Sequence, residues 1–211
     1  ISLKNLLDIT AERQIKNFIF VSTDKAVKPS NIMGYSKRFG EILIHLYNKE
    51  NSNSNFKIVR FGNVLGSSGS LIEILKKDIA KGGPIRITDI NATRFFMTIS
   101  DAASLILQVL LLKNNSTFVL KMGNPVKILD LIKTFLKMNN LTLKNEKNEG
   151  DIKMKIIGLR QGEKLHEELF YNNPKKTENE YILEEDNKNE INSHLILSFV
   201  KKIENISFED T

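Results

Sequence analysis

The chain has 211 residues, and its content of 41% hydrophobic and 27% charged residues is typical of a globular protein. It has no cysteine, which excludes a disulfide framework, a thiol nucleophile and a cysteine-ligated zinc site. No apolar run reaches the roughly 18 residues that a membrane span needs, and we expect a cytoplasmic location.

The net charge of +6 is unevenly distributed along the chain. Residues 171–211 carry 5 lysines and 9 acidic residues, a charge of −4, so the first 170 residues carry +10. A basic body suits an anionic ligand such as a nucleotide diphosphate. The sequence lacks the interleaved basic and aromatic residues of a nucleic-acid platform, and we expect no nucleic-acid partner.

Apolar periodicity and turn residues predict helices and strands in alternation. In chain order we expect a helix over residues 1–15, a strand over 17–22, a helix over 31–50, a strand over 56–61, a helix over 71–81, a strand over 85–88, a helix over 101–112, a strand over 118–120, a helix over 126–138, a strand over 153–157, a short helix over 163–170 and a last helix over 194–203. Ser30 or Asn31 can cap the second of these helices, and Ser100 the fourth.

This alternation implies an α/β fold with a parallel sheet and helices on both faces. A dinucleotide-binding sheet opens with a G-x-G-x-x-G fingerprint after a strand, and that fingerprint is missing; residues 66–69 come closest, with the wrong spacing. We therefore predict a Rossmann-like, doubly wound parallel sheet that lacks its N-terminal strands. On this interpretation the chain is the C-terminal part of a longer protein, and roughly a hundred residues are absent upstream.

Polar side chains gather where the first predicted strand ends. The apolar run over residues 18–21 is followed by Ser22, Thr23, Asp24 and Lys25. Catalytic groups in an open α/β sheet gather at the carboxyl ends of strands. An adjacent acid and base suit elimination chemistry, which needs both on one substrate. An isolated Asp-Lys pair would more often be an exposed turn.

The next predicted helix carries Lys37 back toward this strand end. Residues four apart share a helix face, so Met33 is the residue that accompanies Lys37. Tyr35 is only two residues away and points roughly to the opposite side. Met33 cannot accept a proton, and Tyr35 should not substitute for it.

Four ordered blocks carry a specific resemblance. They are residues 21–27 with 31–38, then 60–70, 93–98 and 158–165. Together they resemble the extended short-chain dehydrogenase/reductases that dehydrate nucleotide sugars, and among these the polysaccharide-biosynthesis UDP-N-acetylglucosamine 4,6-dehydratases. The resemblance covers about residues 1–185.

The resemblance implies an enzyme that uses bound NAD or NADP and a UDP-sugar substrate. The cofactor takes a hydride from sugar C4 and returns it to C6 after water has been eliminated across C5 and C6. The product is a 4-keto-6-deoxy sugar for polysaccharide or glycan synthesis. The resemblance also implies a homo-oligomer, and full-length relatives that can be anchored in a membrane through an N-terminal region.

The same resemblance divides the chain into three parts. Residues 1–65 are expected to form the C-terminal half of the NAD(P)-binding Rossmann domain. Residues 66–185 are expected to be mainly a small mixed α/β subdomain that binds the nucleotide sugar, with elements that complete the sheet interleaved. Residues 186–211 are expected to be an acidic tail that is weakly structured or helical.

The resemblance assigns catalytic roles to four residues. Thr23 would hydrogen-bond the C4 oxygen, Asp24 would be the acid and Lys25 the base. Lys37 would hold the nicotinamide ribose and favour loss of the C4 hydroxyl proton through its charge. The typical superfamily pattern has a tyrosine at the position of Met33, and its loss here puts more of that deprotonation on Thr23 and Lys37.

Other residues are expected to bind ligands. Ser22, Met33, Lys37 and Phe61 would contact the cofactor. Asn63, Arg94, Arg160 and Glu163 would contact the substrate, the arginines through phosphate oxygens and Glu163 through ribose hydroxyls. Gln161 stands where the family has proline, which loosens the turn but keeps these side chains. The three histidines lack metal-ligand spacing, and we expect no metal site.

Two other functions stay open at this point. One is a nucleotide-sugar epimerase of the same fold, which Met33 and the Asp24–Lys25 pair disfavour. The other is a non-catalytic, truncated remnant, which the missing glycine fingerprint favours. Whichever of these functions holds, we expect the 211 residues alone to be inactive, because the main cofactor-binding unit is absent from them.

Overall fold

The computed structural model describes residues 1–51, 53–67, 69–185, 196 and 198–202. In chain order its elements are α1 (Ser2–Glu12), β1 (Asn17–Thr23), the 3-10 helix η1 (Asp24–Ala26), α2 (Ile32–Glu50), β2 (Asn55–Phe61), β3 (Asn63–Leu65), α3 (Leu71–Ala80), β4 (Ile85–Ile87), β5 (Thr93–Arg94), β6 (Phe96–Thr98), α4 (Ile99–Val109), β7 (Thr117–Leu120), β8 (Val126–Lys127), α5 (Ile128–Met138), β9 (Met154–Ile156), β10 (Lys175–Lys176) and β11 (Ile182–Glu185).

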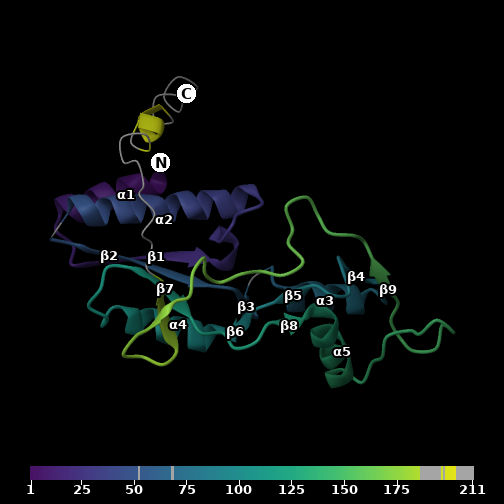
Figure 1. Cartoon of the computed structure of the whole chain (residues 1–211). Helices are drawn as coiled ribbons and strands as arrows, with labels where there is room; N and C mark the ends of the chain where they lie inside the picture. The colour runs from purple at the N-terminus through teal and green to yellow at the C-terminus, as the bar shows by residue number, and fades with distance from the viewer. Residues whose placement is uncertain (52, 68, 186–195, 197, 203–211) are drawn as a thin grey trace.

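The main sheet has the strand order β1-β2-β7-β11-β10. Strands β1, β2 and β7 are parallel, as predicted, and β11 and β10 add an antiparallel edge. Residues 56–60 of β2 are all buried, as expected of a parallel strand that is covered on both faces. Helices α1 and α2 cover one face of this sheet and α4 lies on the other (Figure 1).

Alternate residues of β2 feed the two cores on opposite faces of the sheet. Phe56 and Ile58 pack with Leu7 of α1 and Leu43 of α2. Val59 packs on the other face with residues of β7 and α4. The doubly wound architecture is therefore confirmed in the part of the chain that the structure describes.

A third core lies beside the sheet, between α3, α5 and the short strands β4 and β9 (Figure 1). Its buried centre includes Leu75, Ile85, Ile132 and Leu136. It belongs to the region for which we predicted a small mixed α/β subdomain. The proposed boundaries between the three parts of the chain stay predictions.

Several element bounds differ from the predicted ones because local hydrogen bonds decide them. Helix α4 begins earlier, because Thr98 rather than Ser100 caps it by accepting a bond from the Asp101 amide at 3.0 Å. Helix α5 begins only at Ile128, because the two residues before it pair with β5. The antiparallel strands β10 and β11 were not predicted.

The predicted short helix over residues 163–170 is wrong. This segment runs alongside β5 instead: the Thr93 amide donates to the Leu165 carbonyl at 3.0 Å, and the Thr93 hydroxyl lies 2.9 Å from His166 Nδ1. Of the predicted last helix, residues 196 and 198–202 are helical, and its other residues lie outside the described part. Most of the predicted acidic tail lies outside it as well.

No helix in the described ranges combines the length and apolarity that crossing a bilayer requires. The cytoplasmic location stays a prediction.

Lys57 is a charged residue inside the core between β2 and α4. It is 1% exposed, and its ammonium donates to the carbonyls of Val109, Leu110 and Leu112, just where α4 ends. Burial lowers the pKa of this lysine. The side chain satisfies carbonyl groups that a helix terminus leaves unpaired.

We predict that Lys57→Met destabilises the protein by about 1–3 kcal/mol, the usual scale for leaving buried polar groups unsatisfied. Urea unfolding measures this, with Lys76→Met on the exposed side of α3 as the matched control. Equal unfolding free energies for the two variants would contradict the capping role of Lys57.

His45 of α2 is a partly buried titratable group, and its Nε2 atom lies 3.2 Å from the Thr117 hydroxyl of β7. Burial lowers the pKa of His45 from 6.5 to about 4, and the nearby carboxylate of Glu41 only partly opposes this. The folded protein therefore favours the neutral imidazole.

The stabilisation linked to His45 is complete above pH 6.5 and is lost as the pH falls toward about 4. Each unit of pKa difference corresponds to about 1.4 kcal/mol. We predict that His45→Gln has a flatter unfolding free energy between these two pH values in urea titrations. Identical slopes for the variant and the wild type would show that His45 titrates as an ordinary histidine.

Candidate active site

The carboxyl end of β1 turns directly into η1, and α2 packs closely against that turn. A Cβ atom on Gly34 would lie 2.4 Å from the carbonyl oxygen of Lys25, so only glycine allows this approach. The Gly34 amide donates a hydrogen bond to Asn31 Oδ1 at 2.9 Å, and this bond caps α2. The capping prediction for Asn31 is confirmed.

Asp24 and Lys25 form an ion pair at this turn. Asp24 is fully buried, and its Oδ1 atom accepts hydrogen bonds from the Thr23 hydroxyl at 2.8 Å and from Lys25 Nζ at 3.0 Å. Lys25 Nζ also donates to Asn63 Oδ1 at 3.3 Å. Thr23, Asp24, Lys25 and Asn63 therefore meet at one point, and the pair is not an exposed turn.

The second oxygen of the Asp24 carboxylate is buried and has no hydrogen-bond partner among the described residues. It faces Gly62, where an added Cβ atom would lie 3.1 Å from it. Because Gly62 has no side chain, its backbone can lie close to the Asp24 carboxylate. An unpaired buried carboxylate oxygen is costly, and such atoms concentrate where a ligand or a proton is bound.

Glu167 is a residue of this site that the sequence analysis missed. Its side chain is 4% exposed, and Oε1 lies 3.9 Å from Lys25 Nζ. Burial raises the pKa of Glu167; Asp24 adds to this and the charge of Lys25 opposes it. Its position in the sequence, two residues after a matching block, was the only available signal.

Lys37 returns to the end of β1, as predicted. Its Nζ atom donates to the Val21 carbonyl at 3.0 Å and lies 5.0 Å from the centre of the Phe20 ring. Met33, one turn earlier, is 47% exposed. Tyr35 is 59% exposed and has no role in these contacts.

Ser22 and Phe61 were predicted to contact the cofactor; the structure buries Ser22 and leaves Phe61 partly exposed. Phe61 is half-buried against the core on the α4 side of the sheet. The Ser22 hydroxyl donates to Glu41 Oε1 at 2.7 Å. The side chain of Ser22 is therefore already engaged with α2, and its contact with a cofactor stays a prediction.

Glu41 belongs to a fully buried charge network centred on Arg60 of β2. Arg60 donates to both oxygens of Glu41 at 3.0 and 2.9 Å, to Glu185 Oε2 at 2.6 Å and to the Leu169 carbonyl at 3.1 Å. Burial would raise the pKa of Glu41, but the charge and hydrogen bonds of Arg60 outweigh it and hold that pKa below its usual range.

Arg94 and Glu163, which we expected to contact the substrate, form an ion pair with each other. Arg94 is 7% exposed and donates to Glu163 Oε1 at 2.9 Å and to the carbonyls of Thr93 and Leu165 at 2.7 and 3.1 Å. Glu163 also accepts from the Arg160 amide at 3.2 Å. Arg94 thus fixes the loop that presents Arg160, whose own side chain is exposed.

This loop docks on the turn that precedes α2. The Gly162 carbonyl accepts hydrogen bonds from Ser30 Oγ at 2.7 Å and Asn31 Nδ2 at 3.1 Å, and Lys164 Nζ donates to the Val27 carbonyl at 2.8 Å. Gly162 has φ +74, and an added Cβ atom would lie 2.4 Å from the Ser30 carbonyl oxygen. Blocks far apart in the sequence are therefore joined at the site.

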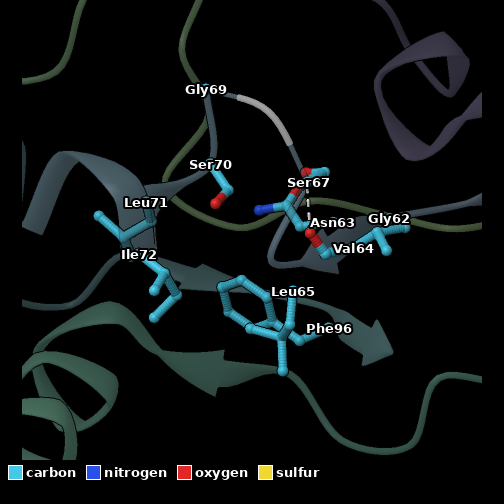
Figure 2. A pocket seen from close by; sticks show the side chains of 10 residues that line it. All are labelled: Gly62, Asn63, Val64, Leu65, Ser67, Gly69, Ser70, Leu71, Ile72 and Phe96. Carbon is cyan, nitrogen blue, oxygen red and sulfur yellow. Dashed lines mark hydrogen bonds between the residues drawn. The ribbon is translucent and has the colours of Figure 1, made fainter. Parts of the chain in front are cut away.

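A cavity of about 410 Å³ opens beside Asn63. Figure 2 shows the side chains of Asn63 and Ser70 projecting toward this space, with Leu65, Ile72 and Phe96 on its other side. The Ser70 hydroxyl is buried and has no partner among the described residues. The cavity combines a rim of glycine and serine residues, two polar groups and an apolar floor.

Within the described ranges, no three histidine, cysteine or acidic side chains lie close enough together to hold a metal ion.

Comparisons with known proteins agree with the fold. Residues 1–185 match the model of a family described as polysaccharide biosynthesis protein. The chain is 46% identical to the capsular polysaccharide biosynthesis protein CapD of Staphylococcus aureus, over 81% of this chain and 28% of CapD. It is 35% identical to a UDP-N-acetylglucosamine 4,6-dehydratase (inverting) of Campylobacter jejuni, over 78% of this chain and 46% of that protein.

An epimerase is also among the relatives. The chain is 32% identical to a UDP-glucose 4-epimerase of Rickettsia rickettsii, over 79% of this chain and 47% of that protein. The chain thus spans half or less of the length of these curated relatives.

Solved structures share the fold. Pen from Bacillus thuringiensis is 33% identical and superposes with a TM-score of 0.69, over 79% of this chain and 51% of Pen. The dTDP-glucose 4,6-dehydratase DesIV of Streptomyces venezuelae, solved with NAD bound, has a TM-score of 0.67 at 16% identity, over 79% of this chain and 55% of that chain, which shows the Rossmann-type fold alone. Since the family model covers residues 1–185, the chain belongs to this family of polysaccharide biosynthesis proteins, which is related to nucleotide-sugar dehydratases and epimerases.

Proposed function

We propose that the protein containing this chain is a nucleotide-sugar 4,6-dehydratase that converts UDP-N-acetylglucosamine to a UDP-4-keto-6-deoxy sugar. The observation that carries the proposal is the buried ion pair of Asp24 and Lys25 beside the Thr23 hydroxyl. This arrangement puts a proton donor and a proton acceptor within 3.0 Å of each other. Elimination of water across one carbon–carbon bond needs such a pair.

Each residue has a role in that reaction. Thr23 hydrogen-bonds the sugar C4 oxygen. A proton moves from Lys25 to Asp24 along their 3.0 Å hydrogen bond, Asp24 gives it to the C6 hydroxyl as that leaves, and the neutral Lys25 amine takes the C5 proton. Asn63 holds Lys25 through the 3.3 Å hydrogen bond and extends toward the cavity of Figure 2.

NAD or NADP fits the open side of this site. Lys37 and the exposed Met33 flank the carboxyl end of β1, whose outer edge has no partner strand among the described residues. Lys37 would hold the nicotinamide ribose, and Met33 would offer an apolar contact. The bound cofactor would supply reversible hydride transfer at sugar C4 and C6.

The cavity beside Asn63 suits the pyrophosphate of the substrate. Its rim includes Gly69, whose loop can bring backbone amides close to phosphate oxygens. The exposed Arg160 provides a guanidinium for the same anion, while Arg94 and Glu163 keep the Arg160 loop in place.

An epimerase is the second candidate, because epimerases are among the relatives. Epimerisation at C4 needs no acid and base at C5 and C6, so the buried Asp24–Lys25 pair would have no role in that reaction. It also normally uses a tyrosine where this chain has Met33. These residues favour the dehydratase. A non-catalytic remnant is disfavoured by the hydrogen bonds that hold Thr23, Asp24, Lys25 and Asn63 together.

The reaction can be tested with the full-length protein that carries this chain. Incubation with UDP-N-acetylglucosamine should give a product lighter than the substrate by one water molecule, detected by mass spectrometry. A C4-epimerised product of unchanged mass would refute the dehydratase and support the epimerase.

We also predict that Asp24→Asn and Lys25→Ala each lower turnover by about 10²-fold or more, the usual scale for an acid or base. Binding of UDP should barely change, because both residues face the sugar in this proposal. Steady-state kinetics and calorimetric UDP titration measure the two effects, with Lys28→Ala on the protein surface as the control. Near-normal turnover of both variants would show that the pair is only structural.

A further inference from the structure

The turn that follows the Asp24–Lys25 pair contains a strained residue. Lys28, two residues after η1, has φ +43, which lies in the left-handed region that a lysine rarely adopts. Backbone strain of this kind persists only where surrounding contacts hold it, and it concentrates at functional sites. The contacts that hold this turn therefore bear on the geometry of the pair.

One side chain bridges the backbone on both sides of Val27. The Tyr171 hydroxyl donates to the Ala26 carbonyl at 2.9 Å and accepts from the Lys28 amide at 3.0 Å. Ala26 is fully buried, so solvent does not offer its carbonyl another partner in this conformation. The bridge uses the backbone of residue 28 and does not depend on the Lys28 side chain.

We propose that Tyr171 is a positioning residue that holds Lys25 in place against Asp24 and Asn63. The proposal rests on the proposed dehydratase function, since it is the elimination of water that uses the Asp24–Lys25 pair. Tyr171 contacts neither substrate nor cofactor in this proposal and acts only through the backbone of the turn.

The turn is short enough to pass a displacement on to the pair. Lys25 directly precedes Ala26, so a shift of the Ala26 carbonyl moves the Lys25 backbone with it. Gly34 of α2 blocks movement toward the helix, because even a Cβ atom there would lie 2.4 Å from the Lys25 carbonyl oxygen. Lys25 Nζ makes its hydrogen bonds to Asp24 and Asn63 at 3.0 and 3.3 Å, and displacing reacting groups by about 1 Å can cost about 10²-fold in rate.

Tyr171 is itself held firmly by the buried charge network. The guanidinium carbons of Arg38 and Arg60 lie 4.7 and 5.7 Å from the centre of its ring. Its backbone amide donates to Glu185 Oε1, which also accepts from the Asn172 amide at 3.0 Å. Phenylalanine at this position would keep the ring and backbone contacts and would lose only the hydroxyl bridge.

Tyr181→Phe is the matched control. Tyr181 directly precedes β11 and is 54% exposed. Its backbone amide donates to Asn179 Oδ1 at 2.9 Å, and its backbone carbonyl accepts from the Lys121 amide at 2.9 Å. The control removes the same hydroxyl group from a tyrosine that does not contact the turn, and it leaves these backbone bonds in place.

The first test needs no catalysis. Hydrogen exchange of the full-length protein, followed by mass spectrometry of peptides that cover residues 24–30, reports on the order of the turn. Tyr171→Phe should speed exchange of the Lys28 amide about 5-fold or more, because this amide loses its acceptor, and Tyr181→Phe should leave it unchanged. Unchanged exchange in Tyr171→Phe would overturn the proposal whatever reaction the protein catalyses.

The second test is kinetic, with the full-length protein and UDP-N-acetylglucosamine as substrate. Tyr171→Phe should lower kcat about 10-fold or more, with KM nearly unchanged, because the displaced pair acts on the sugar while UDP is held elsewhere. Calorimetric titration of the variant should still give the wild-type affinity and number of UDP sites, which excludes a loss of folded protein as the cause. Tyr181→Phe should keep the wild-type kcat.

The two tests separate this proposal from the proposed function. A wild-type kcat in Tyr171→Phe, or an equal loss of kcat in Tyr181→Phe, would overturn the positioning role. If the exchange result holds but the wild-type protein does not dehydrate the substrate, the proposed function fails, whereas the tyrosine bridge across the turn stands.

Discussion

The structure of the site depends on one buried arginine. Arg60 of β2 joins Glu41 of α2 to Glu185 of β11, with all three side chains 0% exposed. Glu41 accepts a hydrogen bond from the Ser22 hydroxyl at the end of β1, and Arg60 also donates to the Leu169 carbonyl. A buried ion pair is weak evidence for stability, but it specifies geometry strongly, because removing any partner leaves an unpaired buried charge. This network therefore fixes the strand end that carries Asp24 to the segment that carries Glu167.

The chemistry proposed for the site follows from that fixed geometry. A parallel sheet brings the ends of β1 and β2 to the same edge, so Lys25 and Asn63 meet although they are 38 residues apart. The loop with Arg160 then closes on Ser30 and Asn31, where only glycine fits at position 162. The ligand-binding side of the fold is thus built from loops that side-chain hydrogen bonds hold in place.

Much of the fold could be predicted because its signals are local. The β-branched and aromatic run of β1, the capped α2 and the buried β2 each follow from periodicity, and the return of Lys37 to the strand end follows from helix geometry. The segment over residues 163–170 could not be predicted, because its apolar and acidic residues also fit a helix. Its extended form depends on pairing with β5, a contact between residues about 70 positions apart. The position of Glu167 depends on this pairing, and the engagement of Arg94 by Glu163 is equally non-local.

Isotope tracing tests the central claim, dehydration at the Asp24–Lys25 pair, most directly. Substrate labelled with deuterium at sugar C4 would be turned over by the full-length protein, and the product would be examined by NMR. The account predicts that the deuterium moves from C4 to C6, because the hydride removed from C4 returns to C6 after water has left. Deuterium that remains at C4 in a product with an intact C6 hydroxyl would contradict it.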